Sequence, residues 1–125
     1  MAAGTLVSSG SSGNMPTGSG SERLRRALII GLNADWQEIF SGSAGHIYTV
    51  LSIICTNTTA SDAVCAATIE AGGQALYLFA DRDISGAETF VFNDRFVLEE
   101  DDDLNVYTTS TNADFYVSYI DADWS

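Results

Sequence analysis

HIYTVLSIICT, at residues 46–56, is rich in β-branched and aromatic side chains, and both of its alternating faces are largely apolar. A strand with two apolar faces is typical of the centre of a packed β-sandwich. The stretch therefore predicts a central strand, and the neighbouring sequence is interpreted around it.

Apolar or alternating runs separated by turn residues continue on both sides of this strand. The turn residues 33–35 separate two upstream runs, and the only competing helix is a single turn at 21–28. The predicted strands are 27–32, 36–40, 46–56, 63–71, 74–84, 88–93, 95–98, 104–110 and 114–120. Eight or nine closely spaced strands predict an all-β fold, an antiparallel β-sandwich or a jelly-roll-like domain.

The turn positions suggest which strands are hairpin partners. We expect 46–56 to pair with 63–71 and 104–110 to pair with 114–120, while Gly72-Gly73 marks another turn. In the first hairpin Cys55 and Cys65 would lie opposite each other on one face. We favour buried, reduced thiols, and a disulfide remains the alternative.

The first 26 residues, MAAGTLVSSGSSGNMPTGSGSERLRR, are dominated by Gly, Ser and Thr. We predict an extended N-terminal arm at residues 1–26 and a sandwich domain at 27–125. Ordering such a backbone costs about 1 kcal/mol or more per residue, so the arm is expected to lie on another surface. Its apolar patch, Leu6 and Val7, is too short for a secretory signal, and we expect the chain to be made in the cytoplasm.

Charge is unevenly distributed along a chain whose formal net charge is −12. The arm is mildly basic, through Arg23, Arg25 and Arg26, and the rest is strongly acidic. An acidic body is repelled by phosphate backbones, so we expect no nucleic-acid partner. No stretch is long and apolar enough for a membrane span, so no membrane partner is expected either.

No catalytic or metal-binding constellation emerges from the sequence. Glu99–Asp103 (EEDDD) is interpreted as a solvated turn; a Ca²⁺ loop is the alternative, but the spacing of a cation-binding loop is missing. His46 is the only histidine, and no CxxC pair suggests zinc. We therefore expect no enzymatic activity, no cofactor and no metal.

Aromatic residues are frequent near the C-terminus. We expect them to pack in the core or at a subunit seam, and a sugar-stacking platform is the alternative. Trp124 would need a covering surface, such as a neighbouring subunit. The residues concerned are Tyr48, Tyr107, Phe115, Tyr116, Tyr119 and Trp124.

Three turn-and-strand motifs follow one another in the central part of the chain. They are CTNTT at 55–59, SGAETF at 85–90 and VLEEDDDLNV at 97–106. In this order they resemble small virion proteins of tailed bacteriophages over residues 47–120. The sequence departs from that pattern at IYTVLS, where relatives tend to carry a Pro-Ala-Gly turn, so the first strand is expected to run straight on.

The resemblance implies a β-sandwich structural protein of the virion, assembled in the host cytoplasm. The leading hypothesis is a capsid decoration (cement) protein, a homotrimer that binds the major capsid protein and whose arm spans neighbouring subunits. The expected partner-binding residues are Leu6, Val7, Trp124 and the three arginines, which would pair with acidic capsid residues or form a solvated basic hinge. The alternatives are a neck, collar or tail accessory protein and a carbohydrate-binding module that uses Tyr116 and Tyr119.

Overall fold

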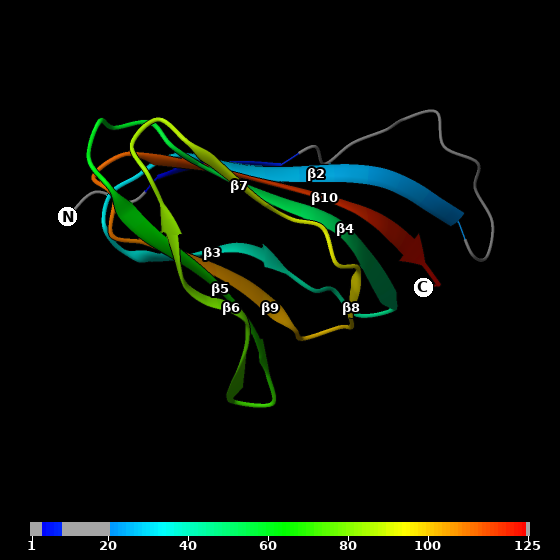
Figure 1. Ribbon diagram of the computed structural model, residues 1–125. Coiled ribbons are helices and arrows are strands. Elements are labelled where there is room, and N and C mark those ends of the chain that lie inside the picture. The colour runs from blue at the N-terminus through cyan, green and yellow to red at the C-terminus, as the bar shows by residue number, and fades with distance from the viewer. Residues whose placement is uncertain (1–3, 9–20, 125) are drawn as a thin grey trace.

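Two antiparallel sheets packed face to face make up the computed structural model, which describes residues 4–8 and 21–124 (Figure 1). Sheet A has the order β1 (Thr5–Ser8), β2 (Ser21–Leu32), β10 (Ala113–Asp123), β4 (His46–Asn57) and β7 (Thr89–Phe92), and β8 (Phe96–Leu98) also pairs with β4. Sheet B has the order β3 (Trp36–Ser41), β9 (Asp103–Thr108), β5 (Ala63–Ala71) and β6 (Gln74–Ile84). No helix among the described residues is long and apolar enough to cross a membrane.

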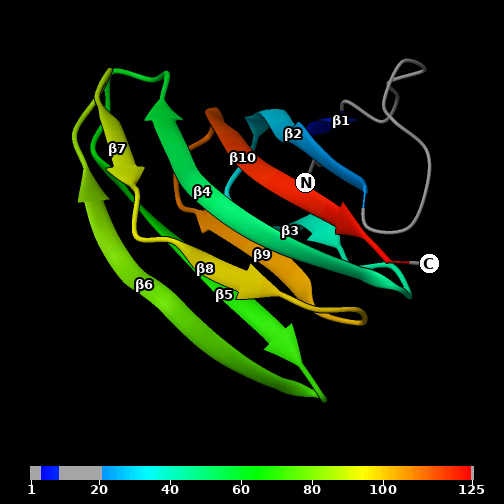
Figure 2. The same cartoon turned by 90° about the vertical axis from the view of Figure 1, so that its right-hand side faces the viewer.

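The strand order is that of a jelly roll, which confirms the predicted fold class. Strands β2, β10, β4 and the β7–β8 edge face β3, β9, β5 and β6. Figure 2 shows β7 and β8 following one another along β4, which runs without interruption from His46 to Asn57, as the sequence predicted.

Two predicted hairpins are wrong because consecutive strands cross between the sheets. β4 lies in sheet A and β5 in sheet B, and β9 and β10 are separated in the same way. The turn at Gly72-Gly73 does join a paired hairpin, β5–β6, whose end projects beyond the two sheets (Figure 1). The alternation of buried and exposed residues along a strand is the same whichever strand it pairs with. The alternation therefore cannot distinguish a hairpin from a crossover between sheets.

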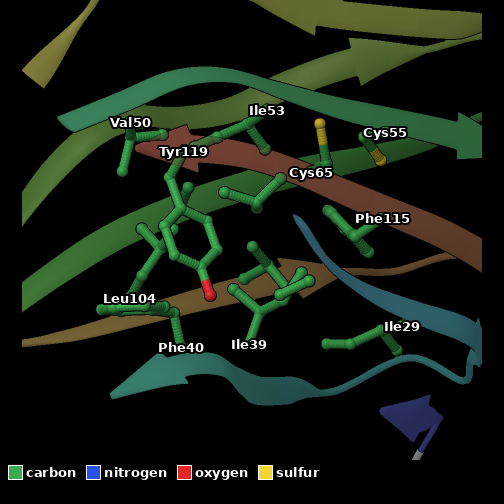
Figure 3. Packing of buried hydrophobic residues seen from close by; sticks show 14 of the residues in the cluster. Ile29, Ile39, Phe40, Val50, Ile53, Cys55, Cys65, Leu104, Phe115 and Tyr119 are labelled. Carbon is green, nitrogen blue, oxygen red and sulfur yellow. The ribbon is translucent and has the colours of Figure 1, made fainter. Parts of the chain in front are cut away.

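The core lies between the sheets and follows the alternation of the strands. In β10 every second residue from Ala113 to Asp121 is buried. Tyr119 projects between the sheets toward Phe40, with ring centroids 5.0 Å apart (Figure 3). Phe40 also meets Tyr48 edge to face at 4.4 Å, so these rings close one end of the core.

Cys55 and Cys65 meet across this core and not within a hairpin (Figure 3). Both are free thiols and both are fully buried, as the sequence interpretation favoured. A side-chain hydrogen bond with Cys65, followed by burial, raises the pKa of the Cys55 thiol. The pair therefore contributes as small apolar packing groups in the neutral form.

The N-terminal part of the sandwich begins earlier than predicted. The expected boundary after Arg26 falls inside β2, because Ser21–Arg26 pair with β10 and form no helical turn. β1 runs antiparallel to the same strand, along Ala27–Ile30. Of the predicted arm, residues 1–3 and 9–20 lie outside the described residues.

Gly4 is closely fitted to the edge of the sandwich. Its amide donates a hydrogen bond to Oε1 of Gln37 at 2.8 Å, and a Cβ at this position would collide with the side chain of Ile29. A glycine is therefore required where β1 begins.

Asn57 is a fully buried amide that joins three loops at one end of the sandwich. Its Nδ2 donates to the carbonyl oxygens of Ser61 at 2.7 Å and Ile84 at 3.3 Å. Its Oδ1 accepts hydrogen bonds from the Thr59 amide at 3.1 Å and the Ser110 hydroxyl at 2.9 Å. The loops after β4, β6 and β9 thus share one side chain, which satisfies polar groups that water does not reach.

Replacing this amide is expected to destabilise the whole domain. Asn57→Ala leaves several buried donors and acceptors without a partner, and should lower the free energy of unfolding by about 3 kcal/mol. Urea denaturation followed by circular dichroism measures the change. Asn93→Ala, at an exposed position, is the matched control, and an equal effect of the two substitutions would contradict the role assigned to Asn57.

Candidate docking face

Mostly apolar side chains form two rows across the outer face of sheet A. The pairing register aligns Leu28, Tyr116, Ile54 and Val91 in one row and Leu24, Ile120, Thr49 and Val97 in the other. A polar row lies between them, in which the hydroxyls of Ser52 and Ser118 are hydrogen-bonded at 2.9 Å and Arg26 lies next to Ser118. The face is a broad striped surface and not a deep cleft.

Most exposed large apolar side chains of the described residues belong to this face. Of the nine, five occupy outward positions of sheet A: Leu24, Ile30, Ile47, Val91 and Val97. A cluster of this kind marks an interaction surface more often than isolated exposed residues do.

The same face carries very little charge. Among the described strand residues of sheet A, the outward charged side chains are Glu22, Arg26 and Asp114. The chain as a whole has a net charge of −12, so its acids are concentrated elsewhere. A partner can approach sheet A without the desolvation of many carboxylates, which is the main cost of burying an acidic surface.

An ion cluster fixes the inner side of the sheet near the end of β10. The Arg25 Nε lies 3.2 Å from Oδ2 of Asp121, and Nδ1 of His46 lies 2.7 Å from Oδ1 of the same carboxylate. Asp121 is almost fully buried, and His46 stacks on Tyr48 with centroids 5.7 Å apart. The cluster explains why an arginine is tolerated at an inward position of β2.

The predicted partner-binding residues are therefore separated by the fold. Arg25 points inward to Asp121, whereas Arg26 lies on the outer face and Arg23 shares the inward side with Arg25. Trp124 is exposed beyond the end of β10, where its amide donates to the Gly45 carbonyl at 2.8 Å. Leu6 and Val7 lie on β1, opposite Ile29 and Leu28.

The aromatic platform considered from the sequence does not form. Tyr119, Tyr48 and Phe115 are buried in the core, as the preferred interpretation expected. Tyr107 from the same set lies on the outer face of sheet B, in a group that sequence reasoning missed: Trp36 stacks on Tyr107 at 4.9 Å and meets Tyr77 edge to face at 6.2 Å. These rings come from β3, β9 and β6, so only the pairing of the strands brings them together.

The acidic run forms a tight turn against the loop between β3 and β4. The Glu99 amide donates to Oδ2 of Asp102 at 2.9 Å, and the Gly45 amide donates to Oε2 of Glu100 at 2.9 Å. Asp103 already belongs to β9 and accepts a hydrogen bond from Ser41. Among the described residues no group of three or more acids, histidines or cysteines is placed to hold a metal ion.

No protein-family model matches the chain, and no curated protein sequence matches it. Solved structures with a similar fold include infectious bursal disease virus strain Gx, with a TM-score of 0.49 and 13% identity over 82% of this chain and 34% of that chain. A Clostridium thermocellum xylanase 10B with CBM22-1 and GH10 modules, complexed with xylohexaose, has a TM-score of 0.42 and 13% identity over 81% and 22% of the two chains.

A pentameric capsid protein isolated from metagenomic phage sequences has a TM-score of 0.43 and 16% identity over 77% of this chain and 62% of that chain. This chain thus spans less than two thirds of the length of each of these three proteins. At such identities and TM-scores the likeness concerns the β-sandwich alone, and the argument about function rests on the residues of this chain.

The ion cluster around Asp121 generates a testable expectation. Asp121→Asn removes the charge that faces Arg25 and His46, and should lower the free energy of unfolding by about 2 kcal/mol, since hydrogen bonds to charged groups contribute about this much. Thermal and urea unfolding measure the loss. Asp94→Asn, at an exposed loop position, is the control, and a loss no larger than the control's would show that the cluster does not stabilise the fold.

Proposed function

We propose that this chain is a structural protein of a tailed-phage virion, a capsid decoration protein that binds the major capsid protein and stabilises the head. The observation that carries the proposal is the outer face of sheet A, which is apolar and nearly uncharged in a strongly acidic chain. The sequence resemblance to small virion proteins supports the same class. The proposal includes no enzymatic activity, no cofactor and no nucleic-acid partner.

The side chains on the outer face of sheet A determine what kind of partner surface can bind there. Two apolar rows separated by a polar row complement a capsid surface with apolar ridges on either side of hydrogen-bonding groups. A net charge of −12 on each chain disfavours the face-to-face pairing of two copies through sheet A. A capsid surface is therefore the partner that we assign to sheet A, in preference to a second copy of the chain.

The N-terminal segment has a smaller part in this proposal than the sequence predicted. Thr5–Ser8 pairs with β2 of the same chain, so we assign no span between subunits to these four residues. Docking is assigned to sheet A, and the homotrimer expected from the resemblance remains a prediction. A neck, collar or tail position in the virion is the second candidate and differs from the first in copy number.

Copy number per particle is the first test of the proposal. Quantitative mass spectrometry of purified particles, with the major capsid protein as internal standard, measures this number. We expect between about one copy per capsid protein and about one copy per three capsid proteins, as for sites repeated over the capsid lattice. About five, six or twelve copies would place the protein at the neck or tail. Its absence from the particles would contradict a virion role altogether.

The docking face is tested by charge substitution. Leu24 is 74% exposed and Val97 is 53% exposed, so Leu24→Asp and Val97→Asp should leave the fold intact. Each places a carboxylate in the apolar contact and should weaken binding to undecorated particles by about tenfold or more. Co-sedimentation with the particles measures the affinity.

The matched control is Leu76→Asp, at a leucine that is 63% exposed near the end of the β5–β6 hairpin. It should bind the particles like the unmodified protein. Equal binding by all variants would overturn the assignment of sheet A. Gel filtration that shows a dimer of the unmodified protein, dissociated by Leu24→Asp, would assign the face to a second copy instead.

A further inference from the structure

The outer face of sheet B carries a hollow that the virion role does not explain. The hollow has a volume of about 460 Å³. Its lining residues belong to sheet B, and sheet A, with the docking face, is the other layer of the sandwich (Figure 1). Two aromatic side chains with exposed surface border it, Trp36 at 40% and Tyr77 at 55% exposure. Thr68, which is buried, also lines the hollow, and the buried Ala66 lies in the cross-strand row of Trp36 and Tyr107.

Polar side chains continue across the sheet beside the rings. The register aligns Glu38, Asn105, Thr68 and Tyr77 on four adjacent strands, and Glu70 lies in the next row. Glu38, Glu70 and Asn105 line the hollow, and none of the three makes a side-chain hydrogen bond to any described residue. Two carboxylates and one amide thus remain available as acceptors and donors for a ligand.

The carboxylates limit the charge of that ligand. Desolvation by burial raises the pKa of Glu38, and the nearby Asp103 and Glu70 carboxylates act in the same direction. A further negative charge would add to this repulsion, so phosphate- or sulfate-bearing ligands are disfavoured at the hollow. Nucleotides and anionic glycans are disfavoured on the same ground.

The arrangement of the rings also disfavours a small organic cation. A cation site needs several aromatic faces directed at one point. Here Trp36 and Tyr107 stack at 4.9 Å with an interplanar angle of 29°, so each ring covers part of one face of the other, and the faces are not directed at a common point. Tyr77 stands at 75° to Trp36 and forms a side wall.

We propose that the hollow of sheet B binds a neutral saccharide, whose ring packs against Trp36 and Tyr77 and whose hydroxyls bond to Glu38, Glu70 and Asn105. A sugar ring offers apolar C–H groups on one face and hydroxyl donors at its rim, which matches aromatic surface beside unpaired carboxylates. The inference goes beyond the virion role, because it concerns the opposite face of the sandwich and a ligand outside the particle.

Tryptophan fluorescence of the isolated protein reads this site directly. The chain has two tryptophans, so Trp124→Phe leaves Trp36 as the sole tryptophan reporter. This variant is titrated with hexamers of β-1,4-linked glucose, xylose and N-acetylglucosamine, and the unmodified protein is screened on a glycan array of neutral bacterial polysaccharides. We expect saturable binding to at least one neutral glycan, with a change in Trp36 emission.

Substitutions in the hollow separate binding from folding. Tyr77→Ala and Asn105→Ala should each weaken binding by about tenfold while the thermal unfolding of the protein stays cooperative. On the glycan array, Trp36→Phe retains an aromatic ring and should bind more tightly than Trp36→Ala. Tyr116→Ala, on the outer face of sheet A, is the matched control and should bind like the unmodified protein.

Three outcomes would overturn the proposal. They are a flat response to every neutral glycan, a loss of binding in Tyr116→Ala equal to that in Tyr77→Ala, and saturation by choline or trimethyllysine without saturation by any glycan. Particle binding through sheet A is measured separately, so either proposal can fail while the other holds.

Discussion

The buried amide of Asn57 is the interaction on which the loop end of this jelly roll depends. Its two polar atoms bond to groups from three loops that are distant in sequence. In a jelly roll these loops connect different sheets, and backbone hydrogen bonds also join them, from the Ala87 amide to the Thr59 carbonyl at 2.8 Å and from the Thr58 amide to the Asn112 carbonyl at 3.1 Å. The Asn57 side chain adds a buried contact to all three loops and thereby helps to align the two sheets.

The same contact gives a physical reason for two of the sequence motifs. Asn57 is the central residue of CTNTT, and its backbone amide donates to the Glu88 carbonyl of SGAETF at 2.9 Å. Gly86 approaches the Ala60 backbone so closely that a Cβ would collide with the Ala60 carbonyl oxygen. The two motifs thus pack against each other, and their residue types are set by buried hydrogen bonding and close approach. They specify an architecture and carry no chemistry of their own.

The elements of the fold could be predicted from sequence more fully than their pairing. Strands 63–71 and 74–84 agree with β5 and β6 because alternation is local. The partner of β4 could not be inferred, because a crossover and a hairpin bury the same alternate residues. The ion pair of Arg25 could not be inferred for a related reason: its partner Asp121 lies almost a hundred residues away. The ring group of sheet B depends on three strand pairings, so no single segment signals it.

The two outer faces of the sandwich differ in chemistry although they share one core. Sheet A has apolar rows with few charges, whereas sheet B has a hollow with rings, carboxylates and an amide. Sheets in a sandwich pack about 10 Å apart, and their outer faces point in opposite directions. A protein docked through sheet A would consequently present sheet B to the surroundings. The distribution of charge is consistent with this division, since the face that loses its water on docking is the one with the fewest carboxylates to desolvate.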